Sequence, residues 1–151
     1  MVERFERFSL SLFELSRCWH RLATEEMRRH GLRSSHATYL TTLLRCEEGL
    51  TAPELGRLCG RDKSDVSRMI AILLERGFVT KEEVDGSLYR GRLKLTETGR
   101  TAAEQVCRRA SLAVEMAGRD LTEAQRAVFY EALTSITANL KILCKEGLPH
   151  E

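Results

Sequence analysis

The stretch from Leu50 to Thr96, LTAPELGRLCGRDKSDVSRMIAILLERGFVTKEEVDGSLYRGRLKLT, carries the signals that decide the fold. Its first half predicts two short helices. Thr51 is a suitable N-cap, Pro53 follows in the first turn, where its missing N–H costs nothing, and Gly60 ends the helix. Asp62 is the N-cap candidate of the second helix, so the turn between the two helices is short. This pattern is typical of a helix-turn-helix unit.

Apolar residues recur at helical spacing in both helices. The residues expected to be buried are Leu55, Leu58 and Cys59 in the first helix and Val66, Ile70, Leu73 and Leu74 in the second. Gly56 is expected where the two helices cross closely. Gly77 ends the second helix, and a segment of β-forming residues follows it.

The second half of the stretch predicts a β-hairpin. Residues 78–84 and 92–95 favour strands, and Asp85-Gly86 between them is a strong tight-turn signal. Alternation along the returning strand places three cations on one face: Arg90, Arg92 and Lys94. Such a face suits contact with a DNA backbone or minor groove, although a merely solvated strand carries similar residues. The fold class is therefore mainly α with a small β-hairpin wing, a winged helix-turn-helix.

In this fold the N-terminal half of the second helix enters the major groove of DNA. The residues off its buried stripe there are Lys63, Ser64, Asp65, Ser67 and Arg68. We expect phosphate contacts from Arg61, Lys63 and the wing cations, and base contacts from Ser64, Ser67 and Arg68. Asp65 would accept a hydrogen bond from a cytosine amino group or cap the helix. The alternative interpretation is a small helical hairpin whose charged face is only solvated.

These motifs resemble those of the MarR family of bacterial transcriptional regulators. Asp62-Lys63-Ser64, Val66-Ser67-Arg68 and residues 74–79 (LERGFV) resemble the family's recognition helix, and residues 93–99 (LKLTETG) resemble the exit from its wing. The resemblance implies a homodimer that binds double-stranded DNA and regulates transcription. One departure lies at the wing tip, where Ser87 and Tyr89 stand in place of the family's Asp-x-Arg pair, leaving Arg90 or Arg92 to take that role.

Composition restricts the class of protein. A chain of 151 residues suits a single domain, and a formal net charge of +2 argues against a polybasic nucleic-acid coat. Without a membrane-spanning apolar run or a signal peptide, we expect a cytoplasmic protein. The five cysteines form no C-x-x-C pair, so no metal site is predicted. The sequence has no G-x-S-x-G, H-E-x-x-H or glycine-rich phosphate loop, so we predict neither enzyme activity nor a cofactor.

Long helices with apolar seams flank the winged unit, which we assign to residues 34–96 of a single domain spanning residues 1–151. We expect residues 1–30 and 97–147 to interlock in a two-fold dimer, since monomers rarely expose seams of this size. The expected dimer contacts are Phe5, Phe8, Leu12, Phe129, Leu133, Ile136 and Leu140. The alternative is an intramolecular bundle with the helix that follows Thr96. A dimer would place two recognition helices about 34 Å apart and so predicts a pseudo-palindromic operator.

The predicted function is therefore that of a regulator, a repressor that covers a promoter. The family resemblance implies an effector site where the dimer helices meet the winged unit; this chain has Trp19, His20, His36 and Tyr39 there. One alternative is thiol sensing through Cys18, similar to relatives that carry a peroxide-sensing cysteine in the first helix. Metal sensing through histidines is less supported, because the helix after Thr96 has none. A third alternative is an interaction adaptor that binds no DNA.

Overall fold

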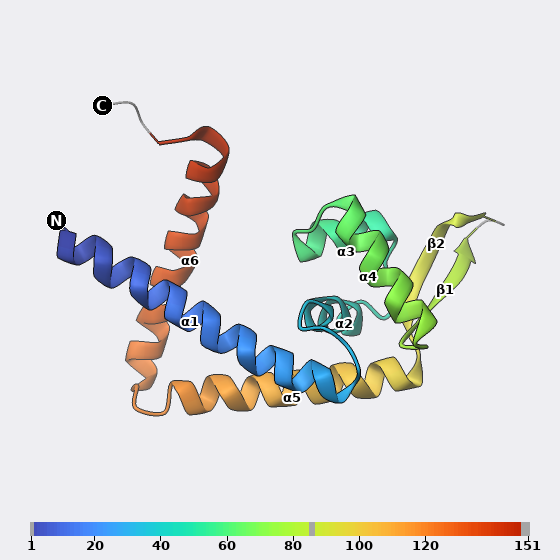
Figure 1. Cartoon of the computed structure of the whole chain (residues 1–151), viewed down its shortest axis with the longest axis horizontal. Coiled ribbons are helices and arrows are strands. Elements are labelled where there is room, and N and C mark those ends of the chain that lie inside the picture. The colour runs from blue at the N-terminus through green and yellow to red at the C-terminus, as the bar shows by residue number, and fades with distance from the viewer. Residues whose placement is uncertain (1, 85–86, 149–151) are drawn as a thin grey trace. The chain divides into compact units, whose positions relative to one another are not determined.

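A computed structural model of the chain describes the backbone of residues 2–84 and 87–148 and the side chains of residues 3–82 and 91–148. The elements are α1 (Val2–Arg29), α2 (His36–Leu44), α3 (Ala52–Cys59), α4 (Lys63–Glu75), β1 (Val79–Val84), β2 (Ser87–Leu95), α5 (Glu97–Ala117) and α6 (Glu123–Glu146) (Figure 1). The predicted class, mainly helical with one β-hairpin, is confirmed; the predicted turn Asp85-Gly86 lies outside the described residues. The chain forms two compact units, Met1–Ser111 and Leu112–Glu151.

The helix-turn-helix forms where its capping residues predict it. Thr51 Oγ1 accepts the Glu54 N–H at 3.4 Å, and Glu54 Oε2 accepts the Thr51 N–H at 2.8 Å, which completes a capping box at the start of α3. Gly60 ends α3 with φ 64°, a left-handed conformation that glycine adopts without a Cβ penalty. Asp62 Oδ1 then accepts the Asp65 N–H at 2.9 Å and starts α4.

The α3–α4 crossing is close because residue 56 has no side chain. A Cβ at Gly56 would lie 2.8 Å from Val66 Cγ2, inside normal contact distance. The buried residues of α3 are Leu55 and Gly56, and Leu58, which was expected in the core, lies off this face and is 55% exposed. In α4 the buried stripe is Val66, Met69, Ile70 and Leu73. Leu74 was also expected in that stripe. It lies at the edge of the buried face of α4 and is 37% exposed.

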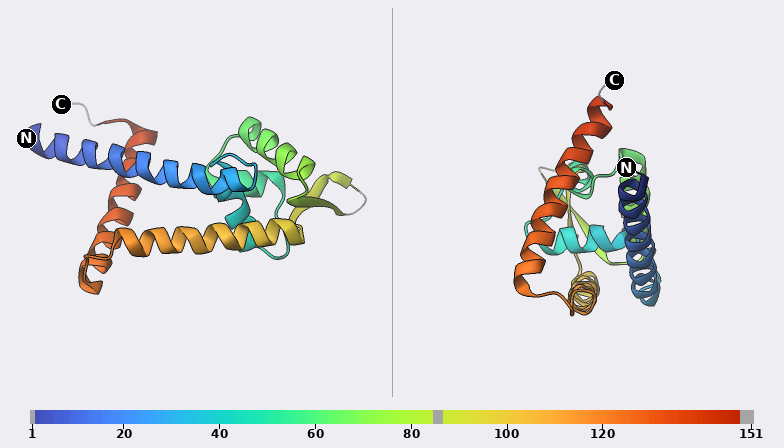
Figure 2. Two further views of the ribbon diagram at one scale, coloured as in Figure 1. Left: turned by 60° about the horizontal axis from the view of Figure 1, so that its bottom comes forward. Right: turned by 90° about the vertical axis from the view of Figure 1, so that its left-hand side faces the viewer.

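The first unit has one hydrophobic core, built from α2, α3, α4, the hairpin and the adjoining ends of α1 and α5 (Figure 2). Its fully buried side chains include Met27, Tyr39, Leu40, Leu55, Leu73 and Leu93. Leu50 exchanges two backbone hydrogen bonds with Leu93, at 3.1 and 2.8 Å, and so ties the segment before α3 to the hairpin. Arg109 on α5 pairs with Glu26 on α1 at 3.3 Å.

The hairpin is antiparallel, with Val79 opposite Leu95 and Glu82 opposite Arg92, and its register shifts between Glu82 and Val84. Its base is joined directly to α5. The Thr96 N–H donates to Phe78 O at 3.1 Å, while Thr96 Oγ1 accepts the Gly99 N–H at 3.0 Å and caps the helix. The orientation of the wing base is therefore fixed by the start of α5.

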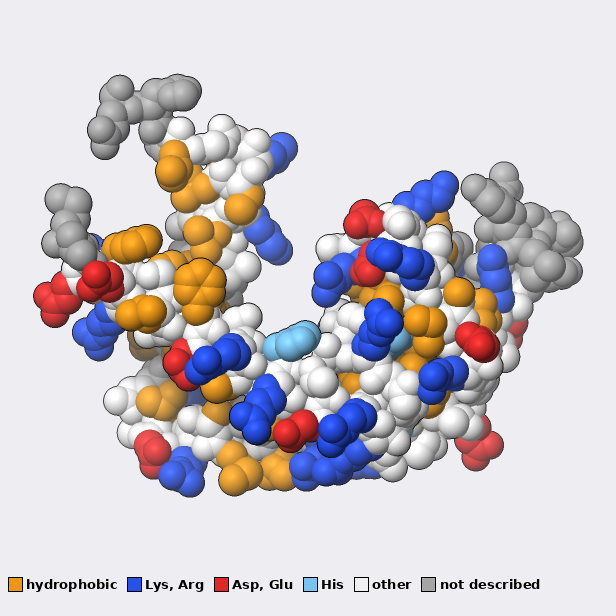
Figure 3. Space-filling view, in the orientation of Figure 1, with side chains coloured by type: hydrophobic (Ala, Val, Ile, Leu, Met, Phe, Trp, Pro, Cys, Tyr) orange, Lys and Arg blue, Asp and Glu red, His pale blue; other side chains and the backbone are white. Residues whose placement is uncertain are grey.

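The second unit consists of the end of α5, a turn and α6. Thr122 and Gln125 form a capping box, and Arg126 Nη2 donates to Gly118 O at 2.9 Å across the turn. No described residue of α6 is buried, and the predicted seam is exposed, from 46% at Phe129 to 40% at Leu140. Hydrophobic side chains also lie on the surface of α1, where Phe5 is 70% exposed (Figure 3). Among the described residues, none of the helices combines the length and hydropathy needed to cross a lipid bilayer.

Candidate nucleic-acid interface

The N-terminal half of α4 presents polar and cationic side chains to solvent. Lys63, Ser64, Ser67 and Arg68 are exposed, as is Arg61 in the preceding turn. Ser67 Oγ donates to Lys63 O at 2.9 Å within the helix, so its hydroxyl proton is engaged while its lone pairs can accept from a ligand. Short serines between long cations allow a polyanion to approach the helix closely.

A groove with a volume of about 510 Å³ lies beside this face. It is lined by Ala52, Pro53, Gly56, Arg57, Arg61, Lys63, Val66, Ser67 and Lys81. The cations come from α3, the turn, α4 and β1, so their convergence depends on the tertiary fold. Figure 3 shows Lys and Arg side chains on the helix-turn-helix part of the surface, as well as along the lower part of the same view. If these cations contacted the phosphates of a nucleic acid, they would displace the counterions bound to it, and the release of those ions would favour binding.

Sequence reasoning missed two residues of this groove. Arg57 lies on α3 four residues before Arg61, but Gly60 ends the helix between them, so helical spacing gave no signal for their convergence. Lys81 gave no signal either, because it reaches the groove only when β1 packs beside the helix-turn-helix.

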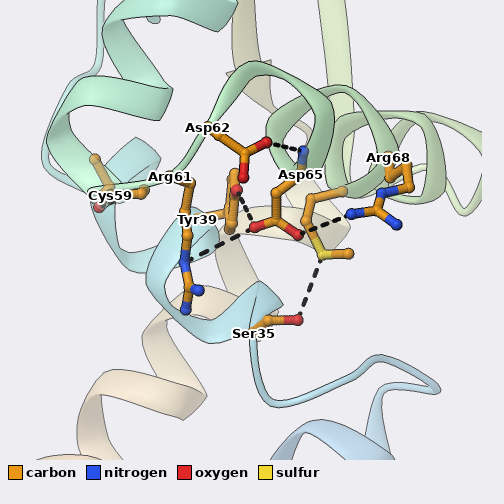
Figure 4. Close-up of polar contacts among 9 residues, drawn as sticks. Ser35, Tyr39, Cys59, Arg61, Asp62, Asp65 and Arg68 are labelled. Atoms are coloured by element: carbon orange, nitrogen blue, oxygen red, sulfur yellow. Dashed lines mark hydrogen bonds and ion pairs between the residues drawn. The ribbon is translucent and has the colours of Figure 1, made fainter.

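Asp65 turns inward, toward the protein, rather than into solvent (Figure 4). Its Oδ2 accepts from the buried Tyr39 hydroxyl at 3.3 Å and lies 3.8 Å from Arg61 Nε, while its Oδ1 lies 3.9 Å from Arg68 Nη2. Burial and the Asp65 charge raise the pKa of Tyr39 to about 12, so the tyrosine is neutral and a donor. The hydrogen bond from the Asp65 N–H lowers the pKa of Asp62, which keeps this N-cap ionised.

The predicted wing cations with described side chains are engaged in contacts within the protein. Arg92 Nη1 donates to Gly49 O at 2.9 Å, and Lys94 Nζ pairs with Glu82 at 2.8 Å. The hydrogen bond and charge of Glu82 raise the pKa of Lys94. The side chain of Arg90, like those of Ser87 and Tyr89, lies outside the described residues. The predicted role of Arg92 in DNA contact therefore requires it to exchange or share its bond to Gly49.

The four residues predicted for an effector site occupy two environments. Trp19 and His20 are exposed on α1, whereas His36 and Tyr39 are buried in the core. His36 Nδ1 accepts the Arg33 N–H at 3.1 Å, and burial lowers the pKa of this imidazole, so it is neutral.

The structure also bears on the predicted redox residue, Cys18, and on metal binding. Cys18 is exposed on α1. Among the described side chains, those of residues 3–82 and 91–148, no three His, Cys, Asp or Glu are grouped to hold a metal ion.

Comparison with known proteins identifies the family that the chain resembles. Residues 30–87 match the sequence profile of the MarR family. A MarR transcriptional regulator from Methanosarcina mazei Go1 is 24% identical, with a TM-score of 0.76, and the match covers 91% of this chain and 92% of that one. Comparison with curated protein sequences gave no match. The resemblance to the MarR family is confirmed.

Two similar structures were solved with DNA. A putative MarR family regulator from Listeria monocytogenes, complexed with 26mer DNA, is 21% identical with a TM-score of 0.76, and the match covers 93% of this chain and 95% of that one. S. aureus MepR, also in a DNA complex, is 18% identical with a TM-score of 0.78, over 88% of this chain and 96% of that one. These similarities establish the winged-helix fold.

Proposed function

Starting from the MarR-family segment at residues 30–87, we propose that this chain is a transcriptional repressor that binds a pseudo-palindromic operator as a homodimer. The observation that carries the proposal is the exposed N-terminal half of α4 beside a groove lined by cations from several elements. In this proposal Ser64, Ser67 and Arg68 contact bases. Phosphates are contacted by Arg57, Arg61, Lys63 and Lys81. The DNA complexes of the Listeria and S. aureus proteins support DNA binding by a chain of this fold.

Dimerisation is proposed from the apolar seams of the terminal helices. Residues 34–96 would bind DNA, and residues 1–30 and 97–147 would join two copies. Phe5, Phe8 and Leu12 on α1 are 44–70% exposed, and Leu133 and Ile136 on α6 are 43% and 40% exposed. Apolar faces of this extent favour burial against a second copy, because soluble monomers seldom leave them in water.

The test is selection of bound fragments from the source organism's own DNA. We expect enrichment of one pseudo-palindrome, and a protein carrying Arg68→Ala should bind it about 1–3 kcal/mol more weakly. Arg108→Ala is a matched control, because both side chains are exposed, at 72% and 68%, and both pair with a carboxylate of their own helix. Failure to enrich any fragment would contradict the proposal and favour the adaptor interpretation.

Regulation by a small molecule is part of the proposal. An effector that prefers one conformation of the dimer shifts operator affinity by that preference. Trp19 and His20 are accessible for this role, whereas contact with His36 or Tyr39 requires α2 to move, because both are buried.

The thiol alternative is favoured by one observation, the exposure of Cys18. Labelling kinetics test it: Cys18 should react faster than the other four thiols, and equal rates would exclude redox sensing through this residue.

A further inference from the structure

Among the polar residues in the N-terminal half of α4, Asp65 does not fit a role in contacting DNA. It lies between the exposed Ser64 and the buried Val66, and its side chain is only 23% exposed. A carboxylate facing DNA would repel phosphates, yet this one faces the protein. Its contacts are one hydroxyl and two guanidinium groups (Figure 4).

The hydroxyl that holds this carboxylate belongs to a rigid part of the molecule. Tyr39 is fully buried in α2, so its ring has no freedom to follow Asp65. Its hydroxyl donates to Oδ2, the oxygen that also lies 3.8 Å from Arg61 Nε, while Arg68 approaches Oδ1. One held carboxylate thus lies within ion-pair distance of two exposed guanidinium groups and favours positions of these long side chains close to it.

Ser35, the N-cap residue of α2, makes a second contact with α4 that does not involve this hydroxyl. Ser35 Oγ donates to Met69 Sγ at 3.4 Å, and Met69 is itself part of the core (Figure 4). Removing the Tyr39 hydroxyl would therefore leave α4 in place and release only the carboxylate and the arginines that it orients.

We propose that Asp65 and Tyr39 are positioning residues that set the sequence specificity of the interface by aiming Arg68 at bases and by limiting the phosphates that Arg61 reaches. This inference rests on the proposed DNA-binding function. Close to Asp65, the positive charges of the two arginines are partly neutralised, and the arginines contact only those DNA groups that lie next to these positions. Freed from Asp65, they would bind any nearby phosphate, since phosphate contacts carry no sequence information.

The experiment compares Asp65→Asn, Tyr39→Phe and the double variant for binding to the selected operator and to an unrelated duplex. Asp65→Asn should strengthen binding to the unrelated duplex, and its log–log salt slope should steepen by about 0.9 for each additional phosphate that the arginines neutralise. Its ratio of operator to unrelated affinity should fall about tenfold, as for loss of one well-placed base contact.

Tyr39→Phe should lower the same ratio without strengthening binding to the unrelated duplex, because the negative charge of Asp65 remains. The double variant should match Asp65→Asn alone, since the hydroxyl acts only through the carboxylate. Tyr130→Phe, at a half-exposed tyrosine of α6, is the control and should change nothing. An unchanged ratio in Tyr39→Phe, or additive effects in the double variant, would overturn the proposal.

A measurement on the free protein separates this proposal from the proposed function. The side-chain ¹⁵N signals of Arg61 and Arg68 should shift in Tyr39→Phe and stay in place in Tyr130→Phe. If the wild-type chain has no sequence preference, the proposed function fails, and the positioning role is then tested by the arginine signals alone. Unshifted arginine signals would overturn the positioning role whether or not DNA binds.

Discussion

Replacing Gly56 by alanine should have opposite effects on stability in two backgrounds that differ only at residue 66. In the wild-type background the new Cβ would lie 2.8 Å from Val66 Cγ2 and 3.4 Å from Arg61 O. Carbon atoms in contact are about 3.5–4.0 Å apart, so α4 must move by about 0.7 Å or Val66 must leave its rotamer. A β-branched side chain in a helix has one strongly preferred rotamer, and Val66 is 3% exposed, so neither change is free.

The expected magnitudes follow from this geometry. Overpacking costs about 1–3 kcal/mol, while exchanging glycine for alanine inside a helix gains about 1 kcal/mol. The net change in the free energy of unfolding is therefore a loss of about 0–2 kcal/mol. In a Val66→Ala background Cγ2 is gone, so Gly56→Ala should instead stabilise α3 by about 0.5–1 kcal/mol.

Urea unfolding of the wild type, the two single variants and the double variant measures this difference. We expect a coupling free energy of about 1–3 kcal/mol between residues 56 and 66. Operator affinity should fall with Gly56→Ala, because displacement of α4 moves the recognition helix relative to the cations of α3. Additivity within about 0.5 kcal/mol would refute the close crossing as the reason for this glycine.

Three further predictions concern the wing base, the core and the dimer. Gly99→Ala should destabilise the fold by about 3 kcal/mol or more, because its Cβ would overlap the carbonyl oxygen of Phe78; thermal unfolding measures this. Burial lowers the pKa of His36 below 6.5, so below that pH the unfolded state binds more protons than the folded state, and the free energy of unfolding decreases as pH falls. In urea unfolding, His36→Asn should therefore reduce the dependence of the free energy of unfolding on pH between about pH 7 and 5. Leu133→Glu should convert dimers to monomers, because it puts a charge in the proposed α6 seam; sedimentation measures this.

Each of these predictions has a matched control. Gly118→Ala should cost little, since its Cβ would meet nothing closer than 3.4 Å, and a similar loss in both variants would contradict the reason given for Gly99. His20→Asn, at an exposed position, should keep the wild-type pH profile; an unchanged slope in His36→Asn would contradict the role of His36. Glu131→Gln, exposed on the same helix as Leu133, should leave the dimer intact, and a Leu133→Glu dimer would contradict the proposed seam.

The elements of the fold were predictable because their signals are local. Capping residues such as Thr51 and Asp62 act within three residues of their own position, and the structure has both in the predicted role. The buried faces were predicted less well. Leu58 and Leu74 have the right spacing and chemistry, but α3 buries Leu55 and Gly56, and α4 buries Val66, Met69, Ile70 and Leu73 instead. Periodicity gives the width of an apolar face, whereas its exact direction depends on the partner helix.

In the candidate site, too, local features could be predicted from the sequence, whereas contacts between distant residues could not. The exposed residues of α4 follow from helical phase, so Lys63, Ser64, Ser67 and Arg68 could be selected from sequence. The inward turn of Asp65 could not, since its partner Tyr39 is 26 residues away in another helix. The contact of Arg92 with Gly49 likewise joins residues 43 positions apart, and no spacing rule relates them.

The most direct test of the central claim, that the cations beside α4 meet phosphates, is the salt dependence of operator affinity for wild type and Lys63→Ala. Lys141→Ala removes the same charge from an exposed position of α6 and serves as the control. We expect log affinity to fall linearly with log salt concentration, and the slope to be smaller by about 1 in Lys63→Ala but unchanged in Lys141→Ala. Equal slopes in all three proteins, or a wild-type affinity that does not depend on salt, would contradict the DNA-binding role of this face.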